Sequence, residues 1–367
     1  MPTVLIIPAG IGCSIGGYAG DAIPFARLLA SATGCLITHP NVMNGASLFW
    51  NDHRIQYVEG YGIDRFVSGD MFLKPVRQQK VGLLLDRAIE EDLLQRHLQV
   101  VDGCRASLGI NIGPVVTTDT PLQISCKKGA SGASWGDIQN PDSLLRAGER
   151  LKEEGATAIA VVTRFPDDYE PKALDAYRKG QGVDLMAGVE AIISHLLVRH
   201  LSLPCAHAPA LSLCPVEAAL DPRAAGEELG HTFLPCVLVG LSRAPSLVSS
   251  GFLGGVSKIS DSQLIGVAQL GAVVAPNGAL GGEAVLACIE RDIPLVIVSN
   301  KGVLSVDAQS LGIRDSSNLR KPSHTYQVGS YLEAAGLLLA LREGIAIPSL
   351  QRPIKDVIQM ESDGTLL

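Results

Sequence analysis

The sequence has 367 residues, of which 47% are hydrophobic and only 4% are aromatic, and its formal net charge is −7. This length can hold two domains or one large α/β unit, and an aliphatic, aromatic-poor composition is typical of buried parallel sheets. The acidic balance excludes a general nucleic-acid binder, which needs a basic stripe. The 8 cysteines include no Cys-x-x-Cys pair, so neither a zinc ribbon nor a thioredoxin-like motif is expected.

The N-terminal segment MPTVLIIPAG is short, uncharged and soon interrupted by glycines, so it is not expected to act as a signal peptide. No uncharged apolar run reaches about 18 residues, so no membrane span is predicted. We therefore expect a cytoplasmic protein whose partner is a small molecule, with no nucleic-acid or membrane partner. The sequence identifies no cofactor and leaves the oligomeric state open, with a homo-oligomer among the alternatives.

The first predicted elements are an aliphatic strand, a glycine-rich loop and a helix. Residues 3–7 form a continuous run of aliphatic and β-branched side chains, which is typical of a buried strand, and a loop follows it. A helix is predicted from about Asp21 and a second strand over 36–38. Farther along the chain, the spacing of apolar residues over 81–95 favours a helix.

Strands and helices continue to alternate in the rest of the chain. A helix is predicted over 143–155 and a strand over 156–165. Residues 234–239 are predicted to be a strand, residues 262–300 a strand–loop–helix–strand unit, and residues 331–344 a helix. This alternation predicts an α/β fold with a mostly parallel, Rossmann-like sheet.

The predicted domain organisation divides the chain into a core, an insertion and a tail. Residues 1–45 and 156–350 are expected to form the α/β core, built from repeated strand–Gly-loop–helix–strand units. Residues 46–155 are expected to form an inserted or second α/β subdomain. The polar segment 351–367 is expected to be a loosely held C-terminal tail.

The core prediction depends on a motif that occurs three times, over 19–41, 187–209 and 281–300. Each copy has a Gly, an acid followed by Ala, about three turns of helix, and a short apolar strand that ends in a polar residue. The acids are Asp21, Glu190 and Glu283, and the polar ends are His39, His207 and Asn300. Whether the copies share an origin is left open, because βαβ units resemble one another for physical reasons.

The candidate site follows from this repeat, because ligands of open parallel sheets bind beyond the carboxyl ends of the strands. His39 and His207 are the predicted acid/base residues, since imidazole transfers protons near pH 7. Glu283 is the third catalytic candidate. The candidate ligand-binding residues are the loop glycines Gly10, Gly12, Gly16, Gly17, Gly281 and Gly282, the acids Asp21 and Glu190, the amides Asn41, Asn44, Asn277 and Asn300, the hydroxyls Ser131 and Ser134, and the cations Lys127, Lys128 and Lys301.

Lys127 and Lys128 are expected to clamp an anion from a mobile loop over 126–137. The alternative is a solvated surface loop. The acid at the start of each repeat helix has an alternative role too, because it can satisfy the helix dipole instead of binding a ligand. Cys205 and His207 lie two residues apart on a predicted strand and share a face, which leaves a Cys/His mechanism open.

Two nucleotide motifs and a metal site are not supported by the spacing of the residues. The loop over 10–17 contains Gly-x-Gly but not Gly-x-Gly-x-x-Gly, and it lacks the Lys-Ser/Thr pair of a P-loop. No compact set of metal ligands is present, so no metal is predicted.

A family resemblance is carried by four strings: IPAGIGCSIGGYAGDAIPFARLLAS, ITHPNVMNGASLFW, AGVEAIISHLLVRHLSLPCAHAPAL and ELGHTFLPCVLVGLSRAP. Together they resemble DUF3326, a family of uncharacterised proteins of cyanobacteria, other bacteria and plant plastids. The resemblance runs through nearly the whole chain and implies a soluble protein, located in the plastid stroma in plant relatives. It implies no reaction, cofactor or catalytic residue.

The leading functional hypothesis is an enzyme that acts on a small anionic or nucleotide-like metabolite at the carboxyl ends of the parallel strands. The reaction type is unknown. One alternative is a non-catalytic metabolite sensor or scaffold. Another is an NAD(P)-dependent oxidoreductase, which the missing Gly-x-Gly-x-x-Gly motif disfavours.

Overall fold

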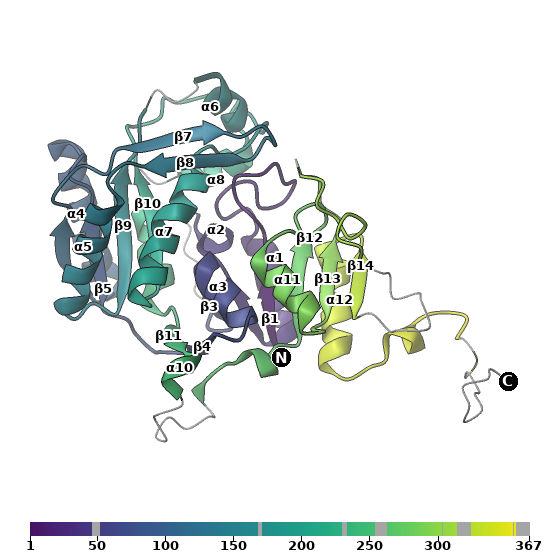
Figure 1. Ribbon diagram of the computed structural model, residues 1–367. Helices are drawn as coiled ribbons and strands as arrows, with labels where there is room; N and C mark the ends of the chain where they lie inside the picture. Colours follow the sequence, from purple (N-terminus) through teal and green to yellow (C-terminus); the bar gives the residue numbers. More distant parts are fainter. Residues whose placement is uncertain are drawn as a thin grey trace.

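The structure is a computed structural model, and it describes residues 1–45, 52–167, 171–229, 233–253, 263–302, 304–313, 324–354 and 356. Two parallel sheets dominate it, each covered by helices on both faces (Figure 1). The predicted α/β class is therefore confirmed. Most of the predicted tail over 351–367 lies outside the described residues.

The larger sheet has six parallel strands in the order β14-β13-β12-β1-β2-β3. Counted along the chain within this sheet, the order is 3-2-1-4-5-6, the arrangement of Rossmann folds. Thr3 pairs with Leu36 on one side and with Ala272 on the other, so the first strand is central. The strands are β1 (Pro2–Leu5), β2 (Cys35–Thr38), β3 (Ile55–Tyr57), β12 (Ala272–Pro276), β13 (Leu295–Val298) and β14 (Thr325–Val328).

Alternate side chains of these strands enter two different cores. Leu5 packs with helices α1 (Ile23–Thr33) and α12 (Tyr331–Arg342) on one face of the sheet. Val4 packs with α3 (Gly60–Val67) and α11 (Glu283–Glu290) on the other face. Successive residues of a strand point to opposite faces, so a strand that is apolar throughout must be covered on both sides.

The second sheet has four parallel strands in the order β10-β9-β5-β6, which is 2-1-3-4 in chain order. Helices α5 and α7 cover one face of it, and helices α4 and α9 cover the other. Its elements are β5 (Val81–Leu85), α4 (Glu91–Leu108), β6 (Ile112–Thr117), α5 (Pro141–Glu153), β9 (Ala158–Arg164), α7 (Ala187–Leu201), β10 (Cys205–Ala210) and α9 (Leu234–Ser242).

The two sheet units contact each other through α3 and α7 and through α2 and α9. The Tyr61 ring of α3 meets the His195 ring of α7 edge-on, with 4.8 Å between ring centroids. The remaining described elements are α2 (Pro40–Met43), β4 (Met71–Lys74), β7 (Ile124–Lys128), β8 (Ser134–Ile138), α6 (Pro171–Arg178), α8 (Pro222–Glu228), β11 (Ser246–Ser249), α10 (Ser250–Leu253) and two 3₁₀ helices, Val267–Gln269 and Ile347–Leu350.

Three sequence predictions of secondary structure are wrong. The helix predicted over 81–95 is strand β5 followed by a turn and the start of α4. The strand predicted over 234–239 is α9, whose first turn contains Pro235 and which is apolar nearly all round. A short apolar run does not by itself distinguish a buried strand from a buried helix. The loop predicted over 126–137 lies largely within a β-hairpin, in which β7 pairs with β8.

The two sheets do not follow the domain boundaries expected at residues 45/46 and 155/156. The six-stranded sheet takes its strands from 2–57 and 272–328, and the four-stranded sheet takes its strands from 81–210. The first and third copies of the repeat contribute to the six-stranded sheet, while the second copy supplies α7 and β10 to the four-stranded sheet. The unit predicted over 262–300 is present as β12, α11 and β13. The repeat therefore places polar strand ends in both sheets.

Candidate functional site

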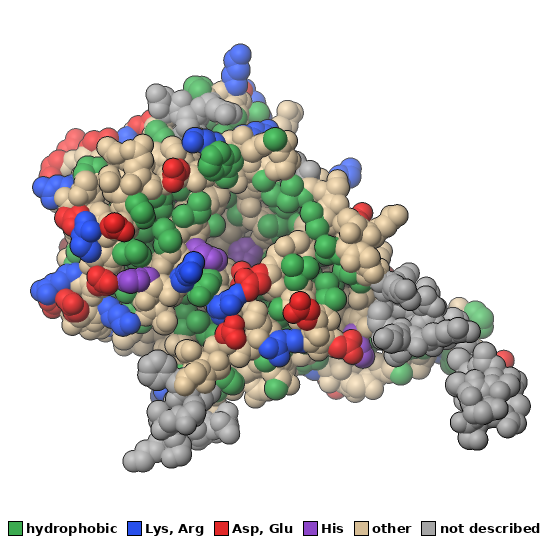
Figure 2. All heavy atoms as spheres, viewed as in Figure 1, with side chains coloured by type: hydrophobic (Ala, Val, Ile, Leu, Met, Phe, Trp, Pro, Cys, Tyr) green, Lys and Arg blue, Asp and Glu red, His purple; other side chains and the backbone are tan. Residues whose placement is uncertain are grey.

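A cavity of about 340 Å³ lies between the two sheet units. Its walls come from the residues after β1 and β2, from the start of α7, and from β10. Figure 2 shows a hollow at the centre of one face of the molecule, with histidine side chains at its floor. Interfaces between domains and the carboxyl ends of parallel strands are both preferred positions for ligand pockets.

His207 lies on β10, and its two ring nitrogens have different surroundings. Its Nε2 is 2.5 Å from the Thr163 hydroxyl oxygen on β9, a contact that fixes the orientation of the ring. Its Nδ1 is 3.4 Å from Oε1 of Glu190 and has no hydrogen-bond partner among the described residues. The side chain is only 2% exposed. Nδ1 therefore faces the Glu190 carboxyl at the cavity wall, where a proton could pass between them or to a ligand.

His39 follows β2 and is held as a neutral imidazole. The backbone N–H of Ile7 donates to its Nε2 at 3.1 Å, so that nitrogen carries no proton and the neutral ring is protonated on Nδ1. Burial lowers the pKa of His39 to about 4. At neutral pH the side chain therefore presents a hydrogen-bond donor and no charge.

Buried carboxyl groups are the other main feature of the cavity. Burial, and next to it the nearby charge of Glu190, raise the pKa of Asp184 to about 7. Burial also raises the pKa of Glu227 well above its usual range, with the charge of Asp184 as the next cause. The Tyr177 hydroxyl donates to Glu227 at 2.8 Å, and the backbone N–H of Ala19 donates to it as well. Two carboxyls with raised pKa values therefore lie in this cavity.

The lining residues that the structure describes include no Lys or Arg. The cavity unites five of the residues predicted from the sequence: His39, Asn41, Asn44, Glu190 and His207. Sequence reasoning missed Glu59, Asp184 and Glu227. No motif marks them, because they enter the cavity only when the two sheet units pack together.

The predicted residues outside the lining are Glu283, Asp21, Gly10, Gly12, Gly16, Gly17, Ser131, Ser134, Lys127, Lys128, Asn277, Gly281, Gly282, Asn300 and Lys301. Asn300 has a clear structural role. Its Oδ1 accepts from the backbone N–H of Ser14 at 2.9 Å, and its Nδ2 donates to the carbonyl of Ile15 at 3.1 Å. These bonds hold the loop after β1 against the end of β13.

Asp21 precedes α1 and lies beside this loop. Burial raises its pKa to about 6, and its Oδ1 has no hydrogen-bond partner among the described residues. The α11 helix uses its own N-terminus in packing: the N–H of Ala284 donates to Asp64 of α3 at 3.0 Å. Glu283 is half exposed and pairs with Arg65 of α3.

The β7–β8 hairpin connects the first loop to α7. The N–H of Ser134 donates to the carbonyl of Gly10 at 2.8 Å, and the Ser134 hydroxyl accepts from the N–H of Gly188 at 3.1 Å. The Lys127 ammonium lies 4.7 Å from the centroid of the Trp135 ring. Both lysines are exposed on β7, so their side chains lie on the hairpin rather than in the cavity wall.

A cysteine nucleophile and a metal find little support in this geometry. Cys205 packs on the α7 side of β10, where its thiol donates to the carbonyl of Leu203 at 3.3 Å. Burial raises the pKa of Cys205 well above its usual range, and only the thiolate is an effective nucleophile. Within the described part of the chain, no group of three or more His, Cys, Asp or Glu side chains could hold a metal ion.

These features define a class: a two-sheet α/β protein with an acid-lined cavity between its sheets. Residues 2–351 match the family described as "Protein of unknown function (DUF3326)", and the chain belongs to this family. Over 346 residues it is 49% identical to a Synechococcus sp. protein named "Uncharacterized lipoprotein", an alignment that covers 94% of this chain and 92% of that protein. No solved structure matches the chain. None of the described helices has the length and apolar character to cross a membrane.

Proposed function

We propose that this protein is an enzyme that applies general acid–base catalysis to a small polar metabolite in the cavity between the two sheets. The observation that supports this most strongly is the group formed by Asp184, Glu190 and His207. One of these carboxyls has a pKa of about 7, and the imidazole directs a free nitrogen toward the other. Titratable groups whose environments separate their pKa values are typical of acid–base sites.

The proposed roles follow from the protonation states. Asp184 and Glu227 hold protons near neutral pH and can donate them to an oxygen or nitrogen of the substrate. Glu190, in contact with Nδ1 of His207, would accept a proton through that ring or directly. His39 would donate a hydrogen bond from Nδ1 without changing its charge.

The lining also bears on the charge of the substrate. With no Lys or Arg among the described lining residues, an anionic group in the cavity would lack a countercharge. The anionic or nucleotide-like ligand expected from the sequence therefore gains no support here. We propose instead a metabolite that carries hydroxyl or ammonium groups, because carboxyls and carbonyls recognise both. A volume of about 340 Å³ suits a small ligand.

The Rossmann strand order is the observation that favours an oxidoreductase as the second candidate. Dinucleotides bind at the switch point between the first and fourth strands, here β1 and β12. At that edge the loop after β1 is bonded to Asn300, and Asp64 already accepts the N–H of Ala284 at the start of α11. The anion-binding amides of that helix are thus partly used, which makes this candidate weaker. Enhanced NADH or NADPH fluorescence on binding would support it.

We further propose a cytoplasmic location, although the Synechococcus relative is named a lipoprotein. Cys13 is buried in the loop after β1. A lipid could be attached to Cys13 only after cleavage directly before it. That cleavage would remove β1, which pairs with both β2 and β12. Cell fractionation tests this: a protein that stays with membranes through a high-salt wash and needs detergent for release would contradict the proposal.

The proposed activity can be tested with a ligand screen followed by turnover measurements. Thermal shift with polyols, sugars, amino acids and amines should give ligands that raise the unfolding midpoint, because binding to the native state stabilises it. Each ligand found is then followed by NMR for chemical conversion. Glu190→Gln and His207→Gln should abolish conversion while the variants stay folded. A matched control is His200→Gln, which alters an exposed histidine of α7 paired with Glu149.

If Glu190→Gln and His207→Gln convert the ligand at the wild-type rate, the acid–base assignment is wrong. If wild-type protein binds a ligand that these variants do not bind, and never converts it, the protein is a sensor rather than an enzyme.

A further inference from the structure

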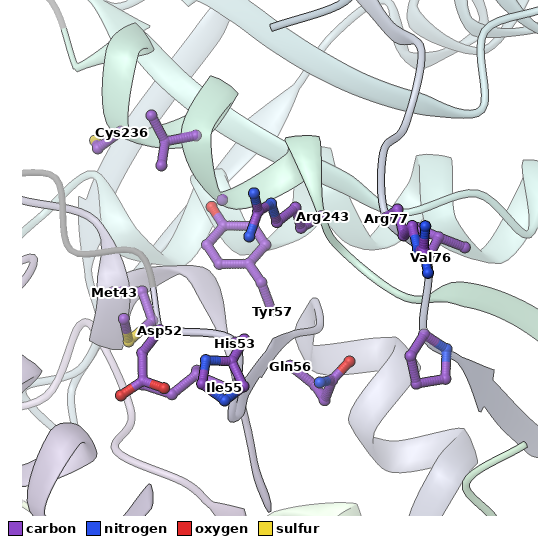
Figure 3. Close-up of a pocket in the computed structure, with 13 residues that line it drawn as sticks. Met43, Asp52, His53, Ile55, Gln56, Tyr57, Val76, Arg77, Cys236 and Arg243 are labelled. Carbon is purple, nitrogen blue, oxygen red and sulfur yellow. The ribbon is translucent and has the colours of Figure 1, made fainter. Parts of the chain in front are cut away.

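A second cavity, of about 390 Å³, lies on the other side of α2 (Figure 3). It is formed between the edge strand β3, the segment after β4 and helix α9. Met43 of α2 lines it, whereas Pro40 and Asn41 of the same helix line the first cavity. The single turn of α2 therefore separates two cavities with different linings.

The floor of the second cavity is aromatic and rigid. A Cβ atom at Gly240 would lie 2.5 Å from the Tyr57 ring, so the absence of a side chain there lets the ring pack directly on α9. The Tyr57 hydroxyl donates to Oδ1 of Asn44 at 2.8 Å, which fixes the ring at its far end. Tyr57 is only 6% exposed, so it forms a fixed end of the cavity that a ligand can touch without ordering a mobile side chain.

The rim carries two arginines, Arg77 and Arg243, both exposed. In Figure 3 Arg243 lies beside Tyr57, while Arg77 stands on a separate segment. Neither guanidinium has an ion pair or hydrogen bond among the described residues. Asp52, the one acid among the described lining residues, is already bonded to Arg54 at 2.6 Å. In a chain of net charge −7, two guanidinium groups without partners at one cavity form an unusual cationic site.

We propose that this second cavity binds a small metabolite with two or more oxyanion groups, carboxylate or phosphate. Arg77 and Arg243 would each hold one anionic group, and the body of the ligand would occupy the cavity between them, whose inner end Tyr57 closes. Guanidinium groups are suited to this role because their forked N–H donors match the oxygens of carboxylates and phosphates. The proposal is independent of any reaction in the first cavity.

Isothermal titration calorimetry of the full chain with citrate and with pyrophosphate tests the proposal. The two probes distinguish carboxylates from phosphates as the source of the oxyanion, and glucose serves as the uncharged comparison. We expect at least one of the anions to bind with a Kd that rises with added salt, since exposed charges are screened. Glucose should not bind.

The variants Arg77→Gln and Arg243→Gln should each weaken binding by about tenfold or more, because each loses charge-assisted hydrogen bonds. The control variants Arg96→Gln and Arg105→Gln remove exposed arginines of α4 that do not line the cavity, and should leave the Kd within about twofold. The proposal is overturned if neither anion binds the wild-type protein, or if the α4 variants weaken binding as much as the cavity variants do.

Discussion

Replacing Asp184 by Asn should stabilise the protein at alkaline pH and abolish turnover. The folded protein raises the pKa of Asp184 from 3.8 to about 7, so it holds this proton more tightly than the unfolded chain does. The resulting stabilisation is complete below about pH 4 and is lost as the pH rises to about 7. Asn is neutral at every pH and keeps an oxygen that can accept from the N–H of Met186, a bond of 2.8 Å in the wild type.

The size of the effect follows from the shift in pKa. About three units correspond to at most about 4 kcal/mol of unfolding free energy, at about 1.4 kcal/mol per unit. The variant should therefore match the wild type near pH 4, exceed it increasingly up to pH 7, and keep a constant advantage above pH 8. His39, whose pKa is lowered to about 4, has the opposite pH dependence but is present in both proteins and cancels in the difference.

Urea unfolding at pH 4.5, 6, 7 and 8.5 measures this difference directly. The matched control is Asp175→Asn, which removes an exposed acid paired with Lys179 at 2.7 Å. Its effect should be small and nearly independent of pH over this range, since exposed ion pairs contribute about 0–1 kcal/mol. If the difference in unfolding free energy between Asp184→Asn and wild-type protein is the same at all four values of pH, Asp184 does not hold a proton in the folded state. The acid–base assignment would then lose its basis.

Two further substitutions test the packing and the limits of the site. Gly240→Ala should destabilise the protein by about 1–3 kcal/mol, because the new Cβ would clash with the Tyr57 ring. Gly103→Ala in α4, where the new Cβ would meet nothing within 4 Å beyond its neighbours in the helix, should instead stabilise the protein by up to about 1 kcal/mol. Equal effects of the two substitutions in urea unfolding would refute this explanation. Glu283→Gln should change the unfolding free energy by less than about 1 kcal/mol and leave turnover intact, because Glu283 is half exposed and pairs with Arg65. A large loss of turnover would show that Glu283 is catalytic after all.

The sequence predicted the fold class because aliphatic strands, loop glycines and amphipathic helices are local signals. It failed at the start of 81–95 and at 234–239, because the apolar runs 81–85 and 234–239 are mostly buried and their periodicity does not distinguish strand from helix. The positions of His39 and His207 at one cavity agree with their equivalent places in the repeat.

The acidic part of the cavity could not be predicted in the same way. Asp184 precedes α7, Glu227 lies in the last turn of α8, and neither belongs to a motif. Their protonation depends on burial between two sheets. Equivalent repeat positions also have different surroundings: Glu190 of α7 meets His207 of β10, whereas Glu283 of α11 meets Arg65 of α3. A repeat specifies a place in a βαβ unit, but the neighbouring unit decides what a side chain contacts.

The pairing of Thr3 with Ala272 has a consequence for how the chain folds during synthesis. The first three strands of the six-stranded sheet leave the ribosome long before their partner β12, and chains fold largely in order of emergence. The four-stranded sheet is complete by residue 210 and needs no later segment for its strand pairing. The four-stranded sheet should therefore form first, while one edge of β1 remains unpaired. Completion of the six-stranded sheet is then the slow step of folding and the step most prone to aggregation.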